Sequence, residues 1–307
     1  MKLLLLLLSI GSSFSLYAQN DWDGFKQDSV QSALDQQWQP FYYRAAVQGN
    51  KPLIVVLHTW SGDYKQTLNS LADETQAKGW NYIHPDFRGP NTRPKACASD
   101  FVLSDIDQAI DWALENLPVN ADSVFVLGAS GGGYATLCTY MKSRHRIRGF
   151  HAYVPISDIA AWYHESLVRN TQYAQNVLDC TNSKDSTLNM AEAKKRSPLF
   201  WETPLELRQD ASLHIYTGVH DGYTGSVPIT HSINFYNKLL RDAGVADSSA
   251  YVDDETTIYL LTKQAGQETG NFIGDRKIHL QKQWKNISLT LFEGTHEMLS
   301  DVALEIL

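Results

Sequence analysis

Short apolar runs alternate along the chain with segments whose apolar residues recur every three or four positions. The runs have the length of buried strands and occupy residues 53–58, 81–87, 123–129, 149–157, 213–219 and 287–294. Between and after them, residues 106–117 and 299–306 carry helical stripes. This alternation predicts an α/β fold with a mainly parallel sheet flanked by helices, and residues 40–46 could add an antiparallel strand at its front edge.

Two segments interrupt the alternation. Residues 158–205 and residues 246–286 are both long for connections between neighbouring elements. Insertions of this size near strand ends often form caps over a site, so we expect residues 158–205 to form a cap-like insertion. No repeat, low-complexity stretch or linker divides the chain, which predicts one domain over residues 19–307.

The first residues, "MKLLLLLLSIGSSFSLYAQN", combine a positive start, a short apolar run and small residues before Gln19. This pattern predicts a signal peptide at residues 1–18 and a secreted or periplasmic product, with an N-terminal anchor as the alternative. No later stretch is apolar and long enough to span a membrane. The formal net charge is −8, and without a basic run the chain is a poor candidate for binding nucleic acid or anionic membranes.

Three cysteines are present, and an exported chain is expected to oxidise a pair of them. Cys138 shares a helical face with apolar neighbours, which indicates a buried thiol. Cys97 and Cys180 lie in loop-like surroundings, so we predict a disulfide between them. Three free thiols are the alternative.

The segment "SVFVLGASGGGYATL", residues 123–137, places one serine among glycines between a strand and a helix. Such a turn can hold a phosphate at a helix N-terminus or present a nucleophilic serine on a strained elbow. A dinucleotide fingerprint would stand at the first strand, with an acidic residue at the end of the next strand. This turn follows earlier strand–helix units and its third fingerprint position is Ser130, so the pattern favours the nucleophile.

A nucleophilic serine requires an acid and then a histidine at later strand ends. Asp221 directly follows the strand at residues 213–219, and His296 follows the last strand. We therefore predict a triad in which His296 is the general base for Ser130 and Asp221 orients His296. Asp158 is a competing acid, since it also follows a strand.

The tetrahedral intermediate of such a reaction needs donors for its oxyanion. The backbone N–H of Gly131 is one expected donor, and the loop "HTWSGDY" supplies the other, for which Trp60 is favoured over Thr59. His58 and His220 lie near the same edge and are interpreted as supporting residues. No metal and no cofactor are expected.

With these residues in place, the chain resembles the α/β-hydrolase superfamily, and within it the single-domain relatives of prolyl oligopeptidases. The segments that carry the resemblance are "GASGGG", "HDGYTGSVP" and "EGTHEM", with "PDFRGPN" and "PKACASD" in support. The resemblance implies Ser130, Asp221 and His296 as the triad and places Arg88 in the loop beside the site.

The expected substrate is an ester on a small molecule or polysaccharide. Exported single-domain relatives often act as esterases on plant or algal polysaccharides, and the aromatic-rich insertion suits sugar faces. The sequence analysis therefore predicts a secreted carboxylic ester hydrolase, with Arg88, Trp162 and Tyr223 as substrate-binding residues. The aromatic side chains could instead pack the cap. A serine exopeptidase of prolyl-oligopeptidase type and a non-catalytic binding module are the alternative functions.

Overall fold

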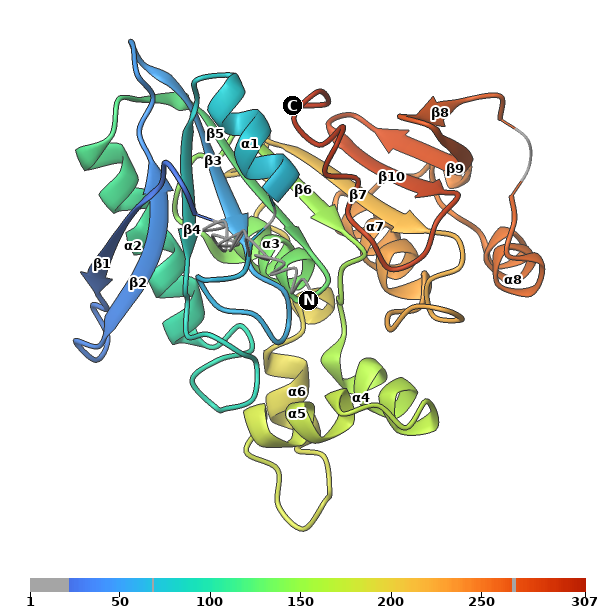
Figure 1. The fold of residues 1–307 in the computed structure, drawn as a ribbon. Coiled ribbons are helices and arrows are strands. Elements are labelled where there is room, and N and C mark those ends of the chain that lie inside the picture. The colour runs from blue at the N-terminus through green and yellow to red at the C-terminus, as the bar shows by residue number, and fades with distance from the viewer. Residues whose placement is uncertain (1–21, 68, 267–268) are drawn as a thin grey trace, which may run out of the picture.

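The computed structural model describes residues 22–67, 69–266 and 269–307. The signal peptide expected at residues 1–18 lies outside these residues. Within them, ten strands form one sheet in the order β1-β2-β4-β3-β5-β6-β7-β10-β9-β8 (Figure 1). The strands are β1 (Lys26–Gln31), β2 (Trp38–Arg44), β3 (Lys51–Leu57), β4 (Asn81–Pro85), β5 (Val119–Ala129), β6 (Gly149–Tyr153), β7 (Ser212–Gly218), β8 (Phe272–Ile273), β9 (Arg276–Trp284) and β10 (Ile287–Phe292).

The centre of the sheet is parallel. Strands β4, β3, β5, β6, β7 and β10 pair in parallel, whereas β1, β2, β9 and β8 add antiparallel partners at the two sides. The α/β class with a mainly parallel sheet is thus confirmed. Residues 40–46 fall largely in β2, which is antiparallel to β4 and is covered on its other side by β1.

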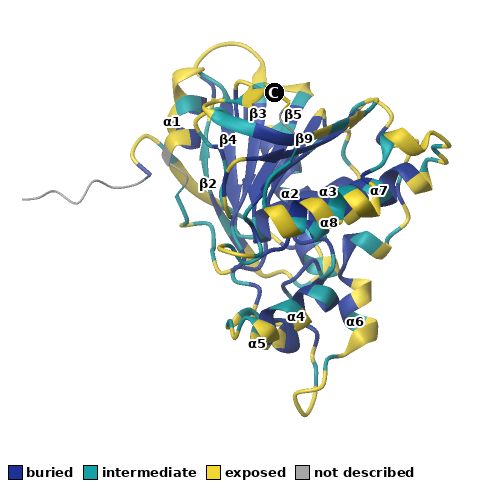
Figure 2. Cartoon of the chain, turned by 90° about the vertical axis from the view of Figure 1, so that its right-hand side faces the viewer, coloured by how far each residue is buried: buried dark blue, intermediate teal, exposed yellow. Residues whose placement is uncertain are grey.

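Helices cover both faces of the sheet because alternate side chains of the buried strands point to opposite sides. Leu53 and Leu57 of β3 pack in a cluster with helices α2, α3 and α7, while Ile54 packs in a second cluster with α1. Figure 2 shows the central strands buried and the outer sides of the helices exposed. The helices are α1 (Asn69–Ala77), α2 (Asp100–Asn116), α3 (Gly131–Lys142), α4 (Ile159–Val168), α5 (Tyr173–Cys180), α6 (Met190–Lys195), α7 (Thr230–Asp242) and α8 (Asp254–Lys263), with short 3-10 turns at Pro198–Phe200 and Ser248–Ala250.

The long insertion after β6 is helical. It contains α4, α5 and α6, which lie below the sheet in the view of Figure 1. Its apolar side chains join Trp60, Tyr134 and Cys138 in a third cluster of buried residues. The insertion therefore has its own small core, which is built directly onto the loop after β3 and onto helix α3.

One expectation for the C-terminal part of the chain was wrong. Residues 299–306 form turns rather than a helix, although Leu299 and Ala303 are buried against the sheet. The apolar stripe spans only about two helical turns, and a helix this short is not stable on its own. The side chains can be buried against the sheet from turns as well. Residues 246–286, the second long connection, contain α8 and the strand β9 that extends the sheet beside β10.

Across the three described ranges, no helix combines the length and the apolar character needed to cross a bilayer.

His84 on β4 makes the stability of the fold depend on pH. Its ring is fully buried, its Nδ1 lies 2.7 Å from the carbonyl oxygen of Val56, and burial lowers its pKa to about 3. As the pH falls below about 6.5, the unfolded chain binds a proton at this residue that the folded chain excludes, so the free energy of unfolding decreases. We expect a loss of about 2 kcal/mol from this residue between pH 7.5 and pH 5.

Urea unfolding at the two pH values measures this loss. The His84→Gln variant cannot titrate at this position, so its free energy of unfolding should fall by about 2 kcal/mol less than that of the wild type over the same interval. The comparison is of pH dependence, so any constant cost of the substitution cancels. An equal decrease in both proteins would contradict the prediction.

Candidate active site

Ser130 lies on a strained turn between β5 and α3. Its φ of 58° and ψ of −118° place a non-glycine residue in a sparsely populated backbone region. The turn fits only because its neighbours lack side chains: a Cβ on Gly128 would lie 2.4 Å from the backbone of Gly132. The backbone N–H of Ser130 donates to the carbonyl oxygen of Tyr153 at 2.9 Å, which ties the turn to β6. This is the elbow geometry expected from the sequence.

Asp221 and His296 form a hydrogen-bonded pair at the ends of neighbouring strands. Asp221 follows β7, His296 follows β10, and 2.7 Å separates Asp221 Oδ2 from His296 Nδ1. The carboxylate is fully buried, and its Oδ1 accepts from the backbone N–H groups of Gly222 and Val227 at 2.9 and 3.0 Å. Three hydrogen bonds thus hold the acid, and the acid holds the imidazole with its Nδ1 inward.

The other ring nitrogen of His296, Nε2, is not bound by Asp221. Among the described residues, His296 Nε2 is buried and has no hydrogen-bond partner, and no hydrogen bond joins it to Ser130 Oγ. Strands β5, β6, β7 and β10 are successive parallel neighbours, so Ser130, Asp221 and His296 all leave the same edge of the sheet. Catalytic hydrogen bonds of this kind often tighten only when substrate binds.

The main chains of Gly131 and Trp60 lie against each other next to the elbow. A Cβ on Gly131 would lie 2.2 Å from the backbone nitrogen of Trp60, so the two main chains are in close contact. Gly131 is the first residue of α3, where an N–H has no partner within the helix. In the part of the chain that the structure describes, Trp60 N–H has no acceptor either, whereas Thr59 N–H donates to Gln66 Oε1 at 2.8 Å. This difference supports Trp60 over Thr59 as the oxyanion donor.

Asp158, the competing acid, has another task. Its Oδ1 accepts from the N–H groups of Ala160 and Ala161 at 2.9 and 3.1 Å, which caps the N-terminus of α4. It makes no hydrogen bond to His296. The geometry therefore favours Asp221 as the acid.

Arg88 cannot bind substrate as the sequence analysis expected. Its side chain is 1% exposed, and the guanidinium forms ion pairs with Asp35, at 2.7 Å, and with Asp105. It also donates to Ser32 Oγ at 2.6 Å. All donors of the guanidinium face these partners or Gln37 Oε1, so Arg88 joins the loop after β4 to the β1–β2 turn and to α2.

Trp162 is also not available to a substrate. It is fully buried, its indole packs edge-on against Trp60 at 4.6 Å between ring centroids, and its Nε1 donates to the carbonyl oxygen of Ser226 at 2.8 Å. The aromatic residues of the insertion thus largely pack its core. Tyr223, the third expected substrate contact, is 55% exposed and its hydroxyl donates to the carbonyl oxygen of Leu261.

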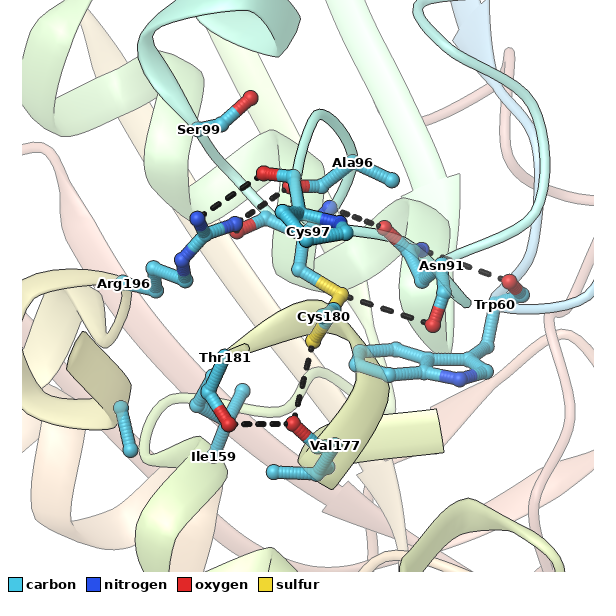
Figure 3. Close-up of a disulfide and its surroundings, with 12 residues drawn as sticks. Trp60, Asn91, Ala96, Cys97, Ser99, Ile159, Val177, Cys180, Thr181 and Arg196 are labelled. Carbon is cyan, nitrogen blue, oxygen red and sulfur yellow. Dashed lines mark hydrogen bonds between the residues drawn. A yellow bond between two sulfur atoms is a disulfide. The ribbon is translucent and has the colours of Figure 1, made fainter. Parts of the chain in front are cut away.

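The disulfide between Cys97 and Cys180 is confirmed, with 6.2 Å between the two Cα atoms (Figure 3). It joins the loop before α2 to the end of α5, and Cys138 remains a buried free thiol. Sequence analysis missed a second connection at the same place: Arg196 donates to the carbonyl oxygens of Ala96 and Pro94 at 2.7 and 2.9 Å. Nothing in the local sequence marks Arg196, because its partners lie about a hundred positions away.

Of the two supporting histidines, His220 places its Nε2 2.7 Å from Glu293 Oε1, and His58 contacts backbone carbonyl groups. Within the described ranges, no group of three or more His, Cys, Asp or Glu side chains is arranged to hold a metal ion.

Comparison with known proteins gives one family match. Residues 74–257 match the model described as the prolyl oligopeptidase family, a range that includes Ser130 and Asp221 and ends before His296. No curated protein matches the chain.

Several solved structures share the fold. Acylaminoacyl peptidase from Pyrococcus horikoshii is 16% identical, with a TM-score of 0.55 over 71% of this chain and 35% of that chain. A puromycin-hydrolyzing peptidase from Mycobacterium tuberculosis is 14% identical, with a TM-score of 0.55 over 71% of this chain and 34% of that chain. Prolyl oligopeptidase B from Galerina marginata is 14% identical, with a TM-score of 0.55 over 79% of this chain and 36% of that chain. The chain therefore matches about a third of the length of each of these proteins.

Proposed function

The chain belongs to the prolyl oligopeptidase family of serine hydrolases, and from this we propose that it is a serine peptidase with Ser130 as its nucleophile. The family expected from the sequence is confirmed. The peptidase, which the sequence analysis held as an alternative, takes the place of the carbohydrate esterase as the proposed activity.

One observation carries the proposal: the hydrogen bond of 2.7 Å between Asp221 and His296, at the sheet edge where the strained Ser130 also lies. A buried carboxylate on Nδ1 fixes the tautomer and leaves Nε2 to accept a proton. A serine hydroxyl is a weak nucleophile, so such a base is what it needs to attack a carbonyl carbon.

The proposed reaction has two halves. Ser130 Oγ bonds to the carbonyl carbon of the scissile peptide while His296 Nε2 takes the hydroxyl proton, and the N–H groups of Gly131 and Trp60 donate to the oxyanion. The C–N bond then breaks, His296 passes its proton to the leaving amine, and an acyl-enzyme remains. Water attacks this ester with His296 as base, and the proton returns to Ser130 Oγ as the acid product leaves.

Peptide substrates are favoured over carbohydrate esters on two grounds. The family model and the similar solved structures carry the names of peptidases. Stacking on a sugar face would need exposed aromatic side chains in the insertion, and Trp162 and Tyr163 are buried. The proposal therefore takes amide bonds of peptides as the substrate class.

A substrate panel tests this function. We expect aminoacyl p-nitroanilides to be hydrolysed with a higher kcat/KM than acetylated, feruloylated or methyl-esterified glycans. The Ser130→Ala variant is the control, since both activities would pass through the same nucleophile. Hydrolysis of the glycan esters alone would show that the protein is a carbohydrate esterase. If neither class is hydrolysed but glycans bind, the result would favour a non-catalytic binding module.

We further propose that the protein is exported. The disulfide supports an oxidising compartment, because cytosolic thiols are normally kept reduced. The apolar N-terminal sequence supports the same location.

A further inference from the structure

The ring of His58 lies between two backbone carbonyl groups at the end of β3. Its Nδ1 is 2.9 Å from the carbonyl oxygen of Thr59, and its Nε2 is 2.6 Å from the carbonyl oxygen of Asp86. The side chain is completely buried, and the ring of Phe87 stacks on it with 3.8 Å between centroids. The imidazole therefore cannot reach a substrate, and both of its ring nitrogens lie within hydrogen-bond distance of main-chain carbonyl oxygens.

Of the two carbonyl groups that His58 contacts, that of Thr59 belongs to the same peptide unit as the N–H of Trp60. In a planar trans peptide, the C=O of Thr59 and the N–H of Trp60 point in opposite directions. Fixing the oxygen at one end therefore fixes the direction of the hydrogen at the other. The Trp60 N–H in turn lies against Gly131, where the two expected oxyanion donors meet.

Few other groups contact the Thr59–Trp60 peptide and could fix its orientation. The Thr59 oxygen also accepts from the backbone N–H of Gly62 at 3.1 Å. On the far side of Trp60, its carbonyl oxygen accepts from the backbone N–H of Asn91 at 2.9 Å and from Asn91 Nδ2 at 3.4 Å (Figure 3). The ring of His58 lies between the Thr59 oxygen and the neighbouring strand end at Asp86.

We propose that His58 is a positioning residue that directs the Trp60 N–H toward the oxyanion by holding the Thr59–Trp60 peptide. This inference rests on the proposed serine hydrolase function. It requires a proton on Nδ1, because a carbonyl oxygen can only accept. A neutral ring carries one N–H and can donate to only one of the two carbonyl groups. Burial lowers the pKa of His58 and so favours the neutral ring, and the inference therefore places its single proton on Nδ1.

Two substitutions at His58 test the roles of the two ring nitrogens one at a time. The amide nitrogen of asparagine can occupy the place of Nδ1 and donate to Thr59, whereas that of glutamine reaches the place of Nε2 and donates to Asp86. We expect His58→Gln to lower kcat by about tenfold or more, which is less than the roughly 100-fold or greater effect of deleting an oxyanion donor. His58→Asn should keep kcat within about threefold of the wild type, and KM should change little in both variants because the donor acts mainly on the transition state.

His84 supplies the matched control, since it is a buried histidine on the next strand whose Nδ1 contacts the Val56 oxygen rather than the Thr59 peptide. His84→Asn and His84→Gln should not differ in kcat. Thermal unfolding of all four variants identifies any that fail to fold. Equal kcat values for folded His58→Asn and His58→Gln would overturn the proposal.

Nitrogen NMR of the His58 ring gives a test that does not depend on a variant. A protonated Nδ1 at the pH of the assay supports the inference, and an unprotonated Nδ1 overturns it. Failure of the proposed function is a different result: there, Ser130→Ala would retain activity, whereas failure of this inference leaves Ser130→Ala inactive and the His58 variants unaffected.

Discussion

Replacing Ser130 with alanine is expected to lower kcat by roughly four to six orders of magnitude. His296→Ala should cost about as much, because the nucleophile and its base act as a unit and either loss removes the attack on the carbonyl carbon. Asp221→Ala should cost about 10⁴-fold, since the base remains but its tautomer and orientation are no longer held. Steady-state hydrolysis of an aminoacyl p-nitroanilide measures these losses, with a fluorophosphonate probe reporting whether Ser130 can still be labelled.

Asp158 provides the control for the acid. It caps α4 and makes no bond to His296, so Asp158→Ala should affect stability, by about 1 kcal/mol for a lost helix cap, and leave kcat near the wild-type value. Loss of activity in Asp158→Ala with retention in Asp221→Ala would show that the acid is wrongly assigned. A triple variant of Ser130, Asp221 and His296 should be no worse than Ser130→Ala alone.

Removing the disulfide is expected to have the largest effect on stability. The bond closes a loop with a sequence separation of 83 residues, for which the chain-entropy relation gives up to about 4–5 kcal/mol of stabilisation. Urea unfolding of the Cys97→Ser/Cys180→Ser double variant measures this difference. Because Arg196 joins the same two segments through Ala96 and Pro94, the insertion should remain docked in the folded variant.

A reducing agent supplies the matched comparison. It should lower the stability of the wild type and of Cys138→Ala alike, because Cys138 is a free thiol, and it should leave the double variant unchanged. Thiol titration of the unfolded, unreduced protein should find one reactive cysteine. Three reactive cysteines, or a double variant as stable as the wild type, would contradict this account.

The edge of the sheet that carries the chemistry could be predicted from the amino-acid sequence. Each apolar run of strand length can be recognised from its own sequence. Parallel strands place their carboxyl ends at the same edge of the sheet. Ser130, Asp221 and His296 each follow such a run, so their convergence could be predicted without knowing any distance between them. Cys97 and Cys180 were paired by a similar argument from their surroundings.

Which side chains are exposed depends on contacts between segments that are distant in sequence. Trp162 and Arg88 have the residue types that bind substrates, but Trp162 lies inside the core of the insertion and Arg88 is buried between the carboxylates of Asp35 and Asp105. Their partners Trp60, Asp35 and Asp105 are distant in sequence, so no local pattern marks these contacts. The turns at residues 299–306 have the same origin, because the sheet buries Leu299 and Ala303 without needing a helix. The periodicity of apolar residues indicates which secondary structure would place them on one face of a segment. Whether a given side chain is buried or paired depends on which other segments pack against it.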